Sequence, residues 1–547
     1  MSLSENARML LQGRYTLPGE APGDVFRRVA RAVGTPECSR FYRMMKDLEF
    51  LPNSPTLMNA GLPGGQLAAC FVLPVEDSIA GIFQTLAVMA QIHKTGGGTG
   101  FSFSDLRPSG DQVGGRPGVA GGPLPFIHVF DEATNALRQG GRRRGANMGV
   151  LASSHPDILA FIGAKQQGGL DNFNLSVGFE GKFFDCLSRG KEYGLTNPRN
   201  KEIQETIMPA NLWEAVAHAA WRSGDPGMLF FDRINEKNTV PGLGQLEATN
   251  PCGEQPLLPF ESCNLGSINL SAFERKGDIN EEGLRNTARL SVEFLDSVID
   301  VTCFPTREIR EATLRTRKIG LGVMGLAELL IRLGIPYSSG DAIRLAGRVM
   351  SVIQEEARQT SHELGADKGS FPAIDMSIYK EDMRNATVTT VAPTGSLHLI
   401  ADTSSGIEPY FSLTMRRSIQ GTETVITPRI VIDILSEVRS GTDIMAKVRR
   451  TGSVQGLPVP EHIRDILRTA CEISPEHHVT MQAEVQKYVD NAVSKTVNLP
   501  ESATPAQVSR IFSFARESGC KGITVYRDNS KERQVILAGT GTCRVCD

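Results

Sequence analysis

The stretch at residues 250–254 constrains this chain most strongly, because it places a cysteine where regular helix is disfavoured. It reads Asn-Pro-Cys-Gly-Glu, and its proline and glycine both oppose helix. In an extended segment, residues two apart point to the same side, so we expect Asn250, Cys252 and Glu254 to project together from a rigid loop tip. An amide, a sulfur and a general base would then share one small volume, which suits catalysis. A surface turn with an incidental cysteine is the alternative, since free cysteines more often pack than react.

The residues that follow support the catalytic interpretation through a resemblance. Gln-Pro continues the stretch, and Ser-Cys-Asn-Leu-Gly-Ser-Ile-Asn-Leu follows at 262–270. Together these segments resemble the finger loop of ribonucleotide reductases, and most closely that of the adenosylcobalamin-dependent class II enzymes. The resemblance implies that Cys252 is the thiyl-radical cysteine and that Asn250 and Glu254 contact the ribose hydroxyls. It also implies that Cys263 is one of two reducing thiols.

Length and composition exclude several classes of protein. A chain of 547 residues can bury a large core, and length alone predicts about three or four domains, although a barrel can run long as one unit. The 58 basic and 61 acidic residues give no basic excess that would suggest a nucleic-acid polymer as ligand. Neither a membrane-spanning apolar run nor a signal peptide is visible in the sequence. Ten cysteines are sparse for this length, so we expect a cytoplasmic, reduced protein without a disulfide framework.

We expect three regions along the chain: a short helical region at 1–48, a catalytic barrel at 49–530, and a flexible tail at 531–547. Apolar residues at 26–33 recur at helical spacing. The first region is too short for the ATP-binding cone of some reductases, so control of overall activity by ATP and dATP is not expected. The resemblance implies an α/β fold, namely a ten-stranded α/β barrel. Its two five-stranded parallel halves would be antiparallel to each other, with the finger loop at the centre.

A second reducing thiol is expected at Cys70. It belongs to an apolar run at 66–74 that fits a buried strand. A packed core cysteine is the alternative, and the residues alone favour it. The resemblance implies that this strand lies beside the strand that carries Cys263.

Two segments contain candidate phosphate-binding residues. Residues 51–61 read as a proline-broken surface turn, and the resemblance makes Ser54 a ligand of the substrate diphosphate. Residues 387–391 read as a strand, followed by Ala-Pro-Thr-Gly-Ser and an apolar run. A strand, a glycine turn and a helix N-terminus form a ready anion site. The resemblance places the substrate phosphates on this second segment, at Pro393, Thr394, Gly395 and Ser396.

Two glycine-rich loops are candidates for cofactor and effector binding. The first, at 94–100, follows a helix expected at 79–92 and fits neither the Walker A pattern nor a dinucleotide fingerprint. Glycines let the backbone approach a bulky ligand, and the resemblance places Gly97 and Gly98 near the substrate and adenosylcobalamin. The second loop, at 140–149, contains Arg143 and Arg144, for which a solvated charge run is the alternative. The resemblance implies that this loop relays the identity of a bound dNTP effector, and arginine suits contacts to nucleotides.

The remaining segments add secondary structure more than chemistry. Apolar residues on one face predict a helix at 281–302, and residues 317–330 predict a glycine-rich helix. Residues 504–507 predict a capping box, with a helix to 518 and a left-handed stop at Gly519. Residues 416–460 match no motif.

The C-terminal residues bear on the radical source and on the reductant. The strand expected at 520–528 contains Tyr526 alone, whereas class I reductases carry two adjacent tyrosines there for radical transfer from a partner subunit. The chain ends with Cys543 and Cys546 in a Cys-x-x-Cys spacing, which suits a mobile thiol shuttle. Half of a zinc ribbon is the alternative, but no second pair supplies the other two ligands, so we expect no metal site.

The resemblance implies an enzyme that reduces ribonucleotides to 2′-deoxyribonucleotides, the precursors of DNA, with adenosylcobalamin as cofactor. No Asp-x-His-x-x-Gly motif is present, so the cobalamin should keep its own base on cobalt. The expected partners are a ribonucleotide, a dNTP effector and thioredoxin or a similar reductant, with no nucleic-acid polymer and no membrane. Diphosphate or triphosphate substrates, and a monomer or homodimer, stay open. The alternatives are a class I large subunit that needs a metal-radical partner and a non-catalytic nucleotide-binding regulator.

Overall fold

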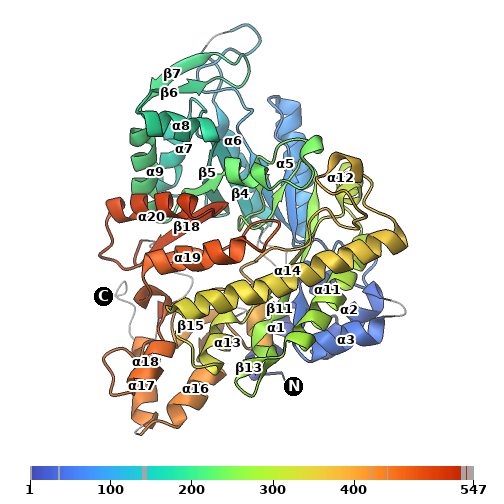
Figure 1. Cartoon of the computed structure of the whole chain (residues 1–547). Coiled ribbons are helices and arrows are strands. Elements are labelled where there is room, and N and C mark those ends of the chain that lie inside the picture. The colour runs from blue at the N-terminus through green and yellow to red at the C-terminus, as the bar shows by residue number, and fades with distance from the viewer. Residues whose placement is uncertain are drawn as a thin grey trace.

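The computed structural model describes residues 3–34, 37–116, 118–137, 145–419, 422–439, 441–530 and 537–538 (Figure 1). Four residues with expected roles, Arg143, Arg144, Cys543 and Cys546, lie outside these ranges. Their roles stay predictions.

Five parallel strands form the first half of a barrel. Their order in the sheet is β2 (Cys70–Leu73), β3 (Gly98–Ser102), β4 (Asn147–Ala152), β5 (Phe173–Phe179) and β8 (Gly227–Phe230). The helices between them are α5 (Ile79–Lys94), α6 (Pro123–Leu137), α7 (Ile158–Gly163), α8 (Gly181–Arg189) and α9 (Pro209–Ser223). Almost every strand residue is buried, as expected for a parallel sheet covered by helices.

A second set of parallel segments forms the other half. Strand β11 (Ser262–Asn269) pairs with β14 (Ile319–Met324), and β17 (Thr496–Leu499) pairs with β18 (Gly522–Arg527). The segment at 389–391 lies between these pairs, with parallel bridges from Thr389 to Leu321 and from Val391 to Val493. This segment includes most of the strand expected at 387–391.

The two halves close on each other through antiparallel pairs. Cys263 of β11 lies opposite Cys70 of β2, and Gly522 of β18 lies opposite Leu229 of β8. Strand β1 (Phe50–Pro52) pairs antiparallel with residues 266–268 of β11, past the part of β11 that pairs with β2. The expected ten-stranded α/β barrel, with two parallel halves set antiparallel, is therefore confirmed.

Helices surround the barrel, and those at the N-terminus pack against its second half. The N-terminal helices are α1 (Glu5–Arg14), α2 (Asp24–Val33), α3 (Cys38–Lys46) and α4 (Ser54–Asn59). They share one apolar core with α11 (Glu281–Val301), α13 (Leu326–Arg332), α14 (Gly340–Lys368) and β14. Further helices around the barrel are α10 (Phe231–Glu236), α12 (Arg307–Thr316), α15 (Leu397–Ala401), α19 (Pro475–Gln486) and α20 (Pro505–Glu517).

Residues 415–466 form a small unit at the opposite end of the molecule from the β6–β7 hairpin (Tyr193–Thr196 and Ile203–Ile207) (Figure 1). The unit contains a hairpin of β15 (Met415–Ile419) and β16 (Thr422–Ile426), followed by α16 (Arg429–Ser436), α17 (Gly441–Thr451) and α18 (Glu461–Ile466). Its helices have their own apolar cluster. Strand β19 (Leu537–Ala538) pairs with β15.

Several helix signals are confirmed and two expectations are wrong. Helices α5 and α11 form where they were expected, and Thr504 and Gln507 make both bonds of a capping box. The helix expected at 317–330 is instead β14 followed by α13. The glycines that suggested tight helix packing allow a strand to approach, because a Cβ at Gly322 would lie 2.2 Å from the Thr390 carbonyl oxygen. The turn expected at 51–61 is instead β1 and α4, which Asn53 caps by accepting from the Thr56 N–H at 3.0 Å.

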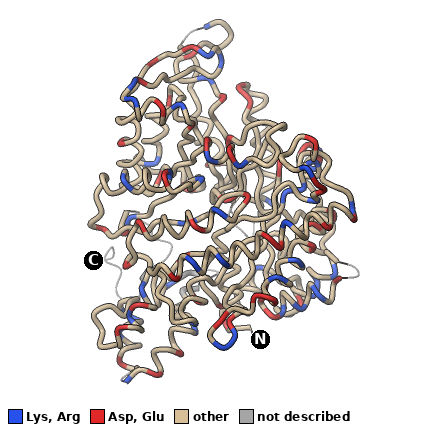
Figure 2. The backbone as a smooth tube through the Cα atoms, viewed as in Figure 1, with Lys and Arg blue, Asp and Glu red and all other residues tan. Residues whose placement is uncertain are grey.

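Charged residues of both signs are interspersed over the whole molecule (Figure 2), in keeping with the near balance of the whole sequence. In the part of the chain that the structure describes, no helix is long and apolar enough to cross a membrane.

Candidate active site

The Asn-Pro-Cys-Gly-Glu stretch forms the tip of a β-hairpin. Strand β9 (Ala248–Thr249) pairs with β10 (Pro256–Leu257), and the Gly253 N–H donates to the Asn250 carbonyl oxygen at 3.1 Å. Gly253 has φ of +81°, a conformation that favours glycine. The tip is therefore a tight turn, and the expectation of an extended segment is wrong. Cys252 is exposed, whereas Asn250 and Glu254 are buried.

The surrounding strands hold this hairpin closely. A Cβ at Gly98 would lie 2.8 Å from the Pro251 ring, and one at Gly100 would lie 1.7 Å from the Thr249 carbonyl oxygen. The Asn174 side chain of β5 donates to the Pro251 carbonyl oxygen at 2.8 Å. On the other side, the Glu254 carbonyl oxygen accepts from the Ala492 N–H at 2.9 Å. Both halves of the barrel therefore fix the finger.

Packing accounts for the two glycines expected near the cofactor. Gly98 faces the finger, and a Cβ at Gly97 would lie 2.6 Å from the Ile92 side chain and 2.8 Å from the Phe71 ring. Neither glycine is among the described residues that line the cavity at Cys252. A role for Gly97 and Gly98 in cofactor binding stays a prediction.

Cys70 and Cys263 lie directly opposite each other on β2 and β11, and they are not joined in a disulfide. Their exposed fractions are 3% and 1%. The Asn250 amide nitrogen donates to the Cys70 sulfur at 3.1 Å, while the Asn250 side-chain oxygen accepts from the Gln255 N–H at 3.0 Å. Asn250 thus joins the finger to the cysteine pair. Burial raises the pKa of the Cys263 thiol well above its ordinary value.

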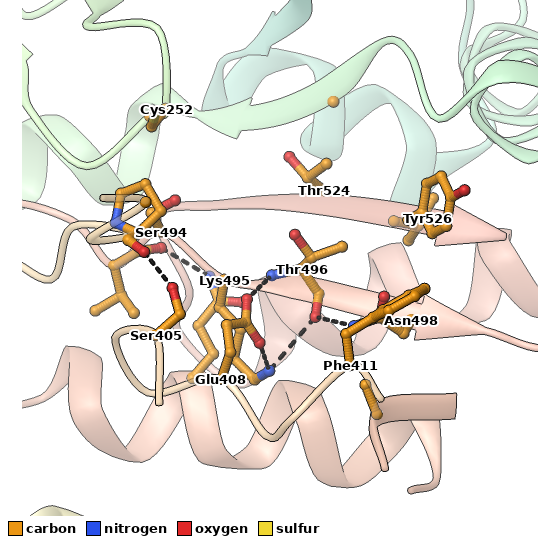
Figure 3. Close-up of a pocket in the computed structure, with 18 of the residues that line it drawn as sticks. Cys252, Ser405, Glu408, Phe411, Ser494, Lys495, Thr496, Asn498, Thr524 and Tyr526 are labelled. Carbon is orange, nitrogen blue, oxygen red and sulfur yellow. Dashed lines mark hydrogen bonds and ion pairs between the residues drawn. The ribbon is translucent and has the colours of Figure 1, made fainter. Parts of the chain in front are cut away.

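Cys252 opens into a cavity of about 620 Å³ between the two barrel halves. Figure 3 shows Cys252 on one side of the cavity, with Glu408, Lys495 and Thr496 on the opposite side. Phe411 and Tyr526 give the wall aromatic surface. Further polar lining comes from Asn174, Ser176, Ser405, Ser494, Asn498 and Thr524.

A buried cation supports the far wall of the cavity. Lys495 donates to Glu408 Oε2 at 2.5 Å and to His478 Nδ1 at 2.9 Å, and His478 Nε2 donates to the Ala470 carbonyl oxygen at 2.9 Å. Burial and the Lys495 charge lower the pKa of His478 to about 2, so this imidazole is neutral. Glu408 Oε1 accepts from the Thr496 N–H at 2.6 Å. These contacts fix the loop that contains Glu408 against β17, and sequence analysis assigned no role to Lys495 or His478.

The two predicted phosphate-binding segments meet at the end of α1. The Tyr15 hydroxyl lies 2.9 Å from Ser54 Oγ, and Arg14 Nη1 donates to Ser396 Oγ at 2.9 Å. Arg14 was not predicted as a site residue, because the sequence of residues 1–48 shows only helical periodicity. Consecutive residues therefore link the serines of two segments that are more than 300 positions apart in the chain.

The Pro393–Ser396 turn borders the cavity that contains Cys252. Pro393 and Gly395 line it, and α15 begins directly after Ser396. Thr394 has φ of +50°, and its hydroxyl accepts from the Gly406 N–H at 2.9 Å. This bond ties the turn to the loop on the far wall.

Comparison with known proteins relates this chain to ribonucleotide reductases. The family model described as "ribonucleotide reductase, barrel domain" matches residues 68–383 and 374–526, and the one described as "ribonucleotide reductase, all-alpha domain" matches residues 1–65. A vitamin B12-dependent ribonucleoside-diphosphate reductase of Thermoplasma acidophilum is 48% identical over 510 residues, which cover 92% of this chain and 66% of that protein. A protein of the same name from Mycobacterium tuberculosis is 46% identical over 561 residues, which cover 98% of this chain and 81% of that protein.

A solved structure supports the fold. The Actinobacillus ureae class Id ribonucleotide reductase alpha subunit has a TM-score of 0.81, covering 96% of this chain and 97% of that one at 23% identity. The family models match nearly all of the barrel and the helices that precede it. The chain therefore belongs to the ribonucleotide reductase family.

Proposed function

We propose that this protein reduces ribonucleoside diphosphates to 2′-deoxyribonucleotides by radical chemistry that depends on adenosylcobalamin. The observation that carries the proposal is the hairpin inside the barrel. It presents Cys252 to a cavity and, through Asn250, contacts Cys70, which lies opposite Cys263 in a buried cysteine pair. The names of relatives 46–48% identical to this chain support the diphosphate substrate and the cofactor.

Each residue of the hairpin has a distinct part in the reaction. Cys252 in its thiyl form removes the ribose 3′-hydrogen and later returns it, and Glu254 accepts the proton of the 3′-hydroxyl. The amide nitrogen of Asn250 has two hydrogens, so one can contact the ribose while the other holds Cys70. Cys70 and Cys263 supply two electrons and two protons and become a disulfide, as the 2′-hydroxyl takes up one of the protons and leaves as water. The barrel wall excludes water, which protects a radical from side reactions.

The cavity suits the adenosyl group of the cofactor. Its volume of about 620 Å³ lies within the roughly 300–1,000 Å³ of small-molecule sites. Phe411 and Tyr526 offer aromatic surface, and Asn498, Ser494 and Thr496 offer polar groups. When bound, adenosylcobalamin supplies an organic radical by breaking its cobalt–carbon bond. The chain's own task is to hold the Cys252 sulfur at this cavity.

The substrate phosphates bind where Ser54 and Ser396 face the end of α1. Both serines supply hydroxyl groups, and Thr394, Gly395 and Pro393 belong to the same turn as Ser396. Arg14 adds a guanidinium, which suits bidentate contacts to phosphate oxygens. The diphosphate end of the substrate is thereby held apart from the reacting ribose.

The regulation of substrate choice and the re-reduction of the Cys70–Cys263 disulfide also belong to the proposed function. A dNTP effector acts through the loop of Arg143 and Arg144, and thioredoxin or a similar dithiol protein supplies electrons through Cys543 and Cys546. A homodimer is the proposed assembly. The relative effects of dNTPs on different substrates, and the mass of the protein in solution, test the effector and the assembly separately.

Turnover by the purified chain tests the central activity. With adenosylcobalamin, a dithiol and CDP, we expect dCDP without any second subunit, and slower turnover of CTP. Cys252→Ala should abolish product while leaving nucleotide binding nearly intact. Cys303→Ala is the matched control, because Cys303 is also an exposed free cysteine but does not line the cavity. Product formation by the Cys252 variant, or dependence on a diiron subunit, would refute the proposal.

A further inference from the structure

A buried ion pair lies next to the reducing cysteines, and the chemistry proposed above does not use it. Lys318 donates to Glu261 Oε2 at 2.6 Å, and the side chains are 2% and 3% exposed. The Glu261 carboxylate also accepts from the Leu258 N–H at 2.7 Å and from the Thr316 hydroxyl at 2.6 Å. Burying two charges is costly even when they are paired, so a functional reason for this pair is worth testing.

Strand register places Lys318 beside Cys263. The parallel ladder between β11 and β14 begins with Asn264 opposite Ile319, so Cys263 and Lys318 are the residues immediately before this first pair. Cys263 in turn lies opposite Cys70 on β2. The order across the three neighbouring segments is therefore Cys70, Cys263 and Lys318.

We propose that Lys318 is a positioning residue for the thiol pair, whose ammonium group stabilises the thiolate of Cys263. Cys263 is then the sulfur that leaves when a dithiol reduces the Cys70–Cys263 disulfide. The inference rests on the proposed function, in which these two cysteines become a disulfide. In this inference the Lys318 charge determines which of the two sulfurs leaves when the disulfide is reduced.

The exchange balances as follows. One thiolate of the external dithiol attacks the Cys70 sulfur and forms a mixed disulfide, while the bond between Cys70 and Cys263 breaks and its electron pair leaves on Cys263. The second thiolate of the dithiol then attacks the mixed disulfide and releases Cys70. The dithiol gives up two electrons and two protons and becomes a disulfide, and the cysteine pair takes them up. A leaving thiol with a lower pKa leaves faster, which is the effect of the Lys318 charge.

The charges that face Cys263 act in opposite directions. Lys318 lowers the pKa of the Cys263 thiol, whereas Glu261 and Glu254 raise it, and burial raises it most. Replacing Lys318 or Glu261 breaks the same ion pair, so a purely structural role predicts changes in the same direction. A role in stabilising the thiolate predicts changes of opposite sign.

The reduction potential of the Cys70–Cys263 couple, measured against pH without substrate, distinguishes these cases. Below the lower of the two thiol pKa values, reduction of the disulfide takes up two protons with its two electrons, and above that pKa it takes up one. The slope of the reduction potential against pH therefore halves at that pKa, which in this inference belongs to Cys263. The full-length protein with Cys543→Ser and Cys546→Ser, which removes competing thiols, is equilibrated in dithiothreitol redox buffers. Alkylation and mass spectrometry of the peptides that contain Cys70 and Cys263 then give the fraction oxidised.

We expect this break in slope at a lower pH in Glu261→Gln than in the parent protein. In Lys318→Met the break should lie at a pH at least one unit above that of the parent. That last shift is a tenfold change in the acid constant. Lys318→Arg keeps the charge and should stay near the parent. If Lys318→Met does not fold, Lys318→Met combined with Glu261→Met leaves no unpaired charge, and its break should lie between those of the parent and Lys318→Met because Glu261 raises the pKa of Cys263.

Two results would overturn the inference. One is a break in the Lys318 variant at or below that of the parent, and the other is a break in Glu261→Gln at or above it. If the two cysteines form no disulfide at all, the proposed role of the pair in the reaction fails instead. The two failures are therefore distinguishable.

Discussion

At the scale of single residues, Arg14 connects the N-terminal helices to the chemistry of the barrel. It is the last residue of α1, and its guanidinium donates to Ser396 at the start of α15. The next residue, Tyr15, contacts Ser54. The end of one helix therefore brings together a cation and two hydroxyl groups, and a guanidinium suits contacts to phosphate oxygens.

Arg14→Met should weaken substrate binding more than turnover. Hydrogen bonds to charged groups contribute roughly 1.5–3 kcal/mol, so KM for CDP should rise roughly 10- to 100-fold. The value of kcat should change little, because in the proposed site Arg14 contacts the phosphates and not the reacting ribose. Steady-state kinetics measure both constants, and Arg8→Met, an exposed arginine on the same helix, is the control. An unchanged KM in the Arg14 variant would place the phosphates elsewhere.

His478 should make the folded protein sensitive to acid. Its pKa is lowered to about 2 by burial and by Lys495, whereas in the unfolded chain it is about 6.5. Because the unfolded state takes up the proton first, this contribution to stability is present above about pH 6.5 and falls by about 1.4 kcal/mol per unit below it. His478→Gln removes the titration but keeps a donor and an acceptor. The stability difference between parent and variant should therefore shrink from pH 7 to pH 5 in urea unfolding.

The matched control for this titration is His462→Gln. His462 is exposed, so its surroundings change little on unfolding, and the variant should follow the parent at every pH. A parent and a His478 variant with parallel pH dependence would contradict the neutral, buried imidazole.

At the scale of elements, the finger hairpin depends on how closely β3 approaches it. Glycines at 98 and 100 leave room for Pro251 and for the Thr249 carbonyl oxygen. The glycine run that suggested a ligand-binding loop is thus part of the support for the hairpin that contains Cys252. A hairpin this tightly enclosed holds its cysteine in one place.

Gly100→Ala should destabilise the protein and displace the finger. The added Cβ would lie 1.7 Å from a backbone oxygen that no side-chain rotation can move. Overpacking of this kind costs about 1–3 kcal/mol, and turnover should fall further than stability alone explains. Thermal unfolding and dCDP formation are the measurements. Gly163→Ala, where no atom lies within 4 Å of the added Cβ, should leave both nearly unchanged.

At the scale of the whole molecule, the C-terminal segment returns to the cavity. Ala538 of β19 pairs with Met415 of β15, and Met415 lines the cavity that contains Cys252. An extended residue spans at most about 3.6 Å, so Cys543 lies within about 18 Å of Ala538 and Cys546 within about 29 Å. For the proposed shuttle, the chain between Ala538 and each terminal cysteine has to span the distance to the thiol pair.

Cys543→Ser combined with Cys546→Ser should lose multiple turnovers with thioredoxin. The buried Cys70 and Cys263 are inaccessible to a protein reductant, and thiol exchange requires direct contact between sulfurs. One turnover from the pre-reduced enzyme should survive, and a small dithiol should restore cycling because it can diffuse into the barrel. Product counted per enzyme molecule measures this. Normal cycling of the double variant with thioredoxin would exclude the shuttle.

Sequence alone determined the features that depend on neighbours in the chain. The loop at Cys252 follows from proline and glycine, although its expected extended form was wrong, helices α2 and α11 follow from apolar spacing, and the cap of α20 follows from Thr504 and Gln507. The same local reasoning failed at β14. Its glycines are needed by a strand segment about 70 positions later, at Thr390, and no local pattern shows that requirement.

The tertiary structure decided which distant residues meet. Closure of the barrel sets Cys70 opposite Cys263, the packing of α1 sets Arg14 against Ser396, and the register of β11 and β14 sets Lys318 beside Cys263. Periodicity and turn chemistry act over a few residues, whereas these contacts join segments that only burial of a shared core brings together. The resemblance to a family anticipated the first contact. The contact of Arg14 with Ser396 and the position of Lys318 beside Cys263 could be known only from the tertiary structure.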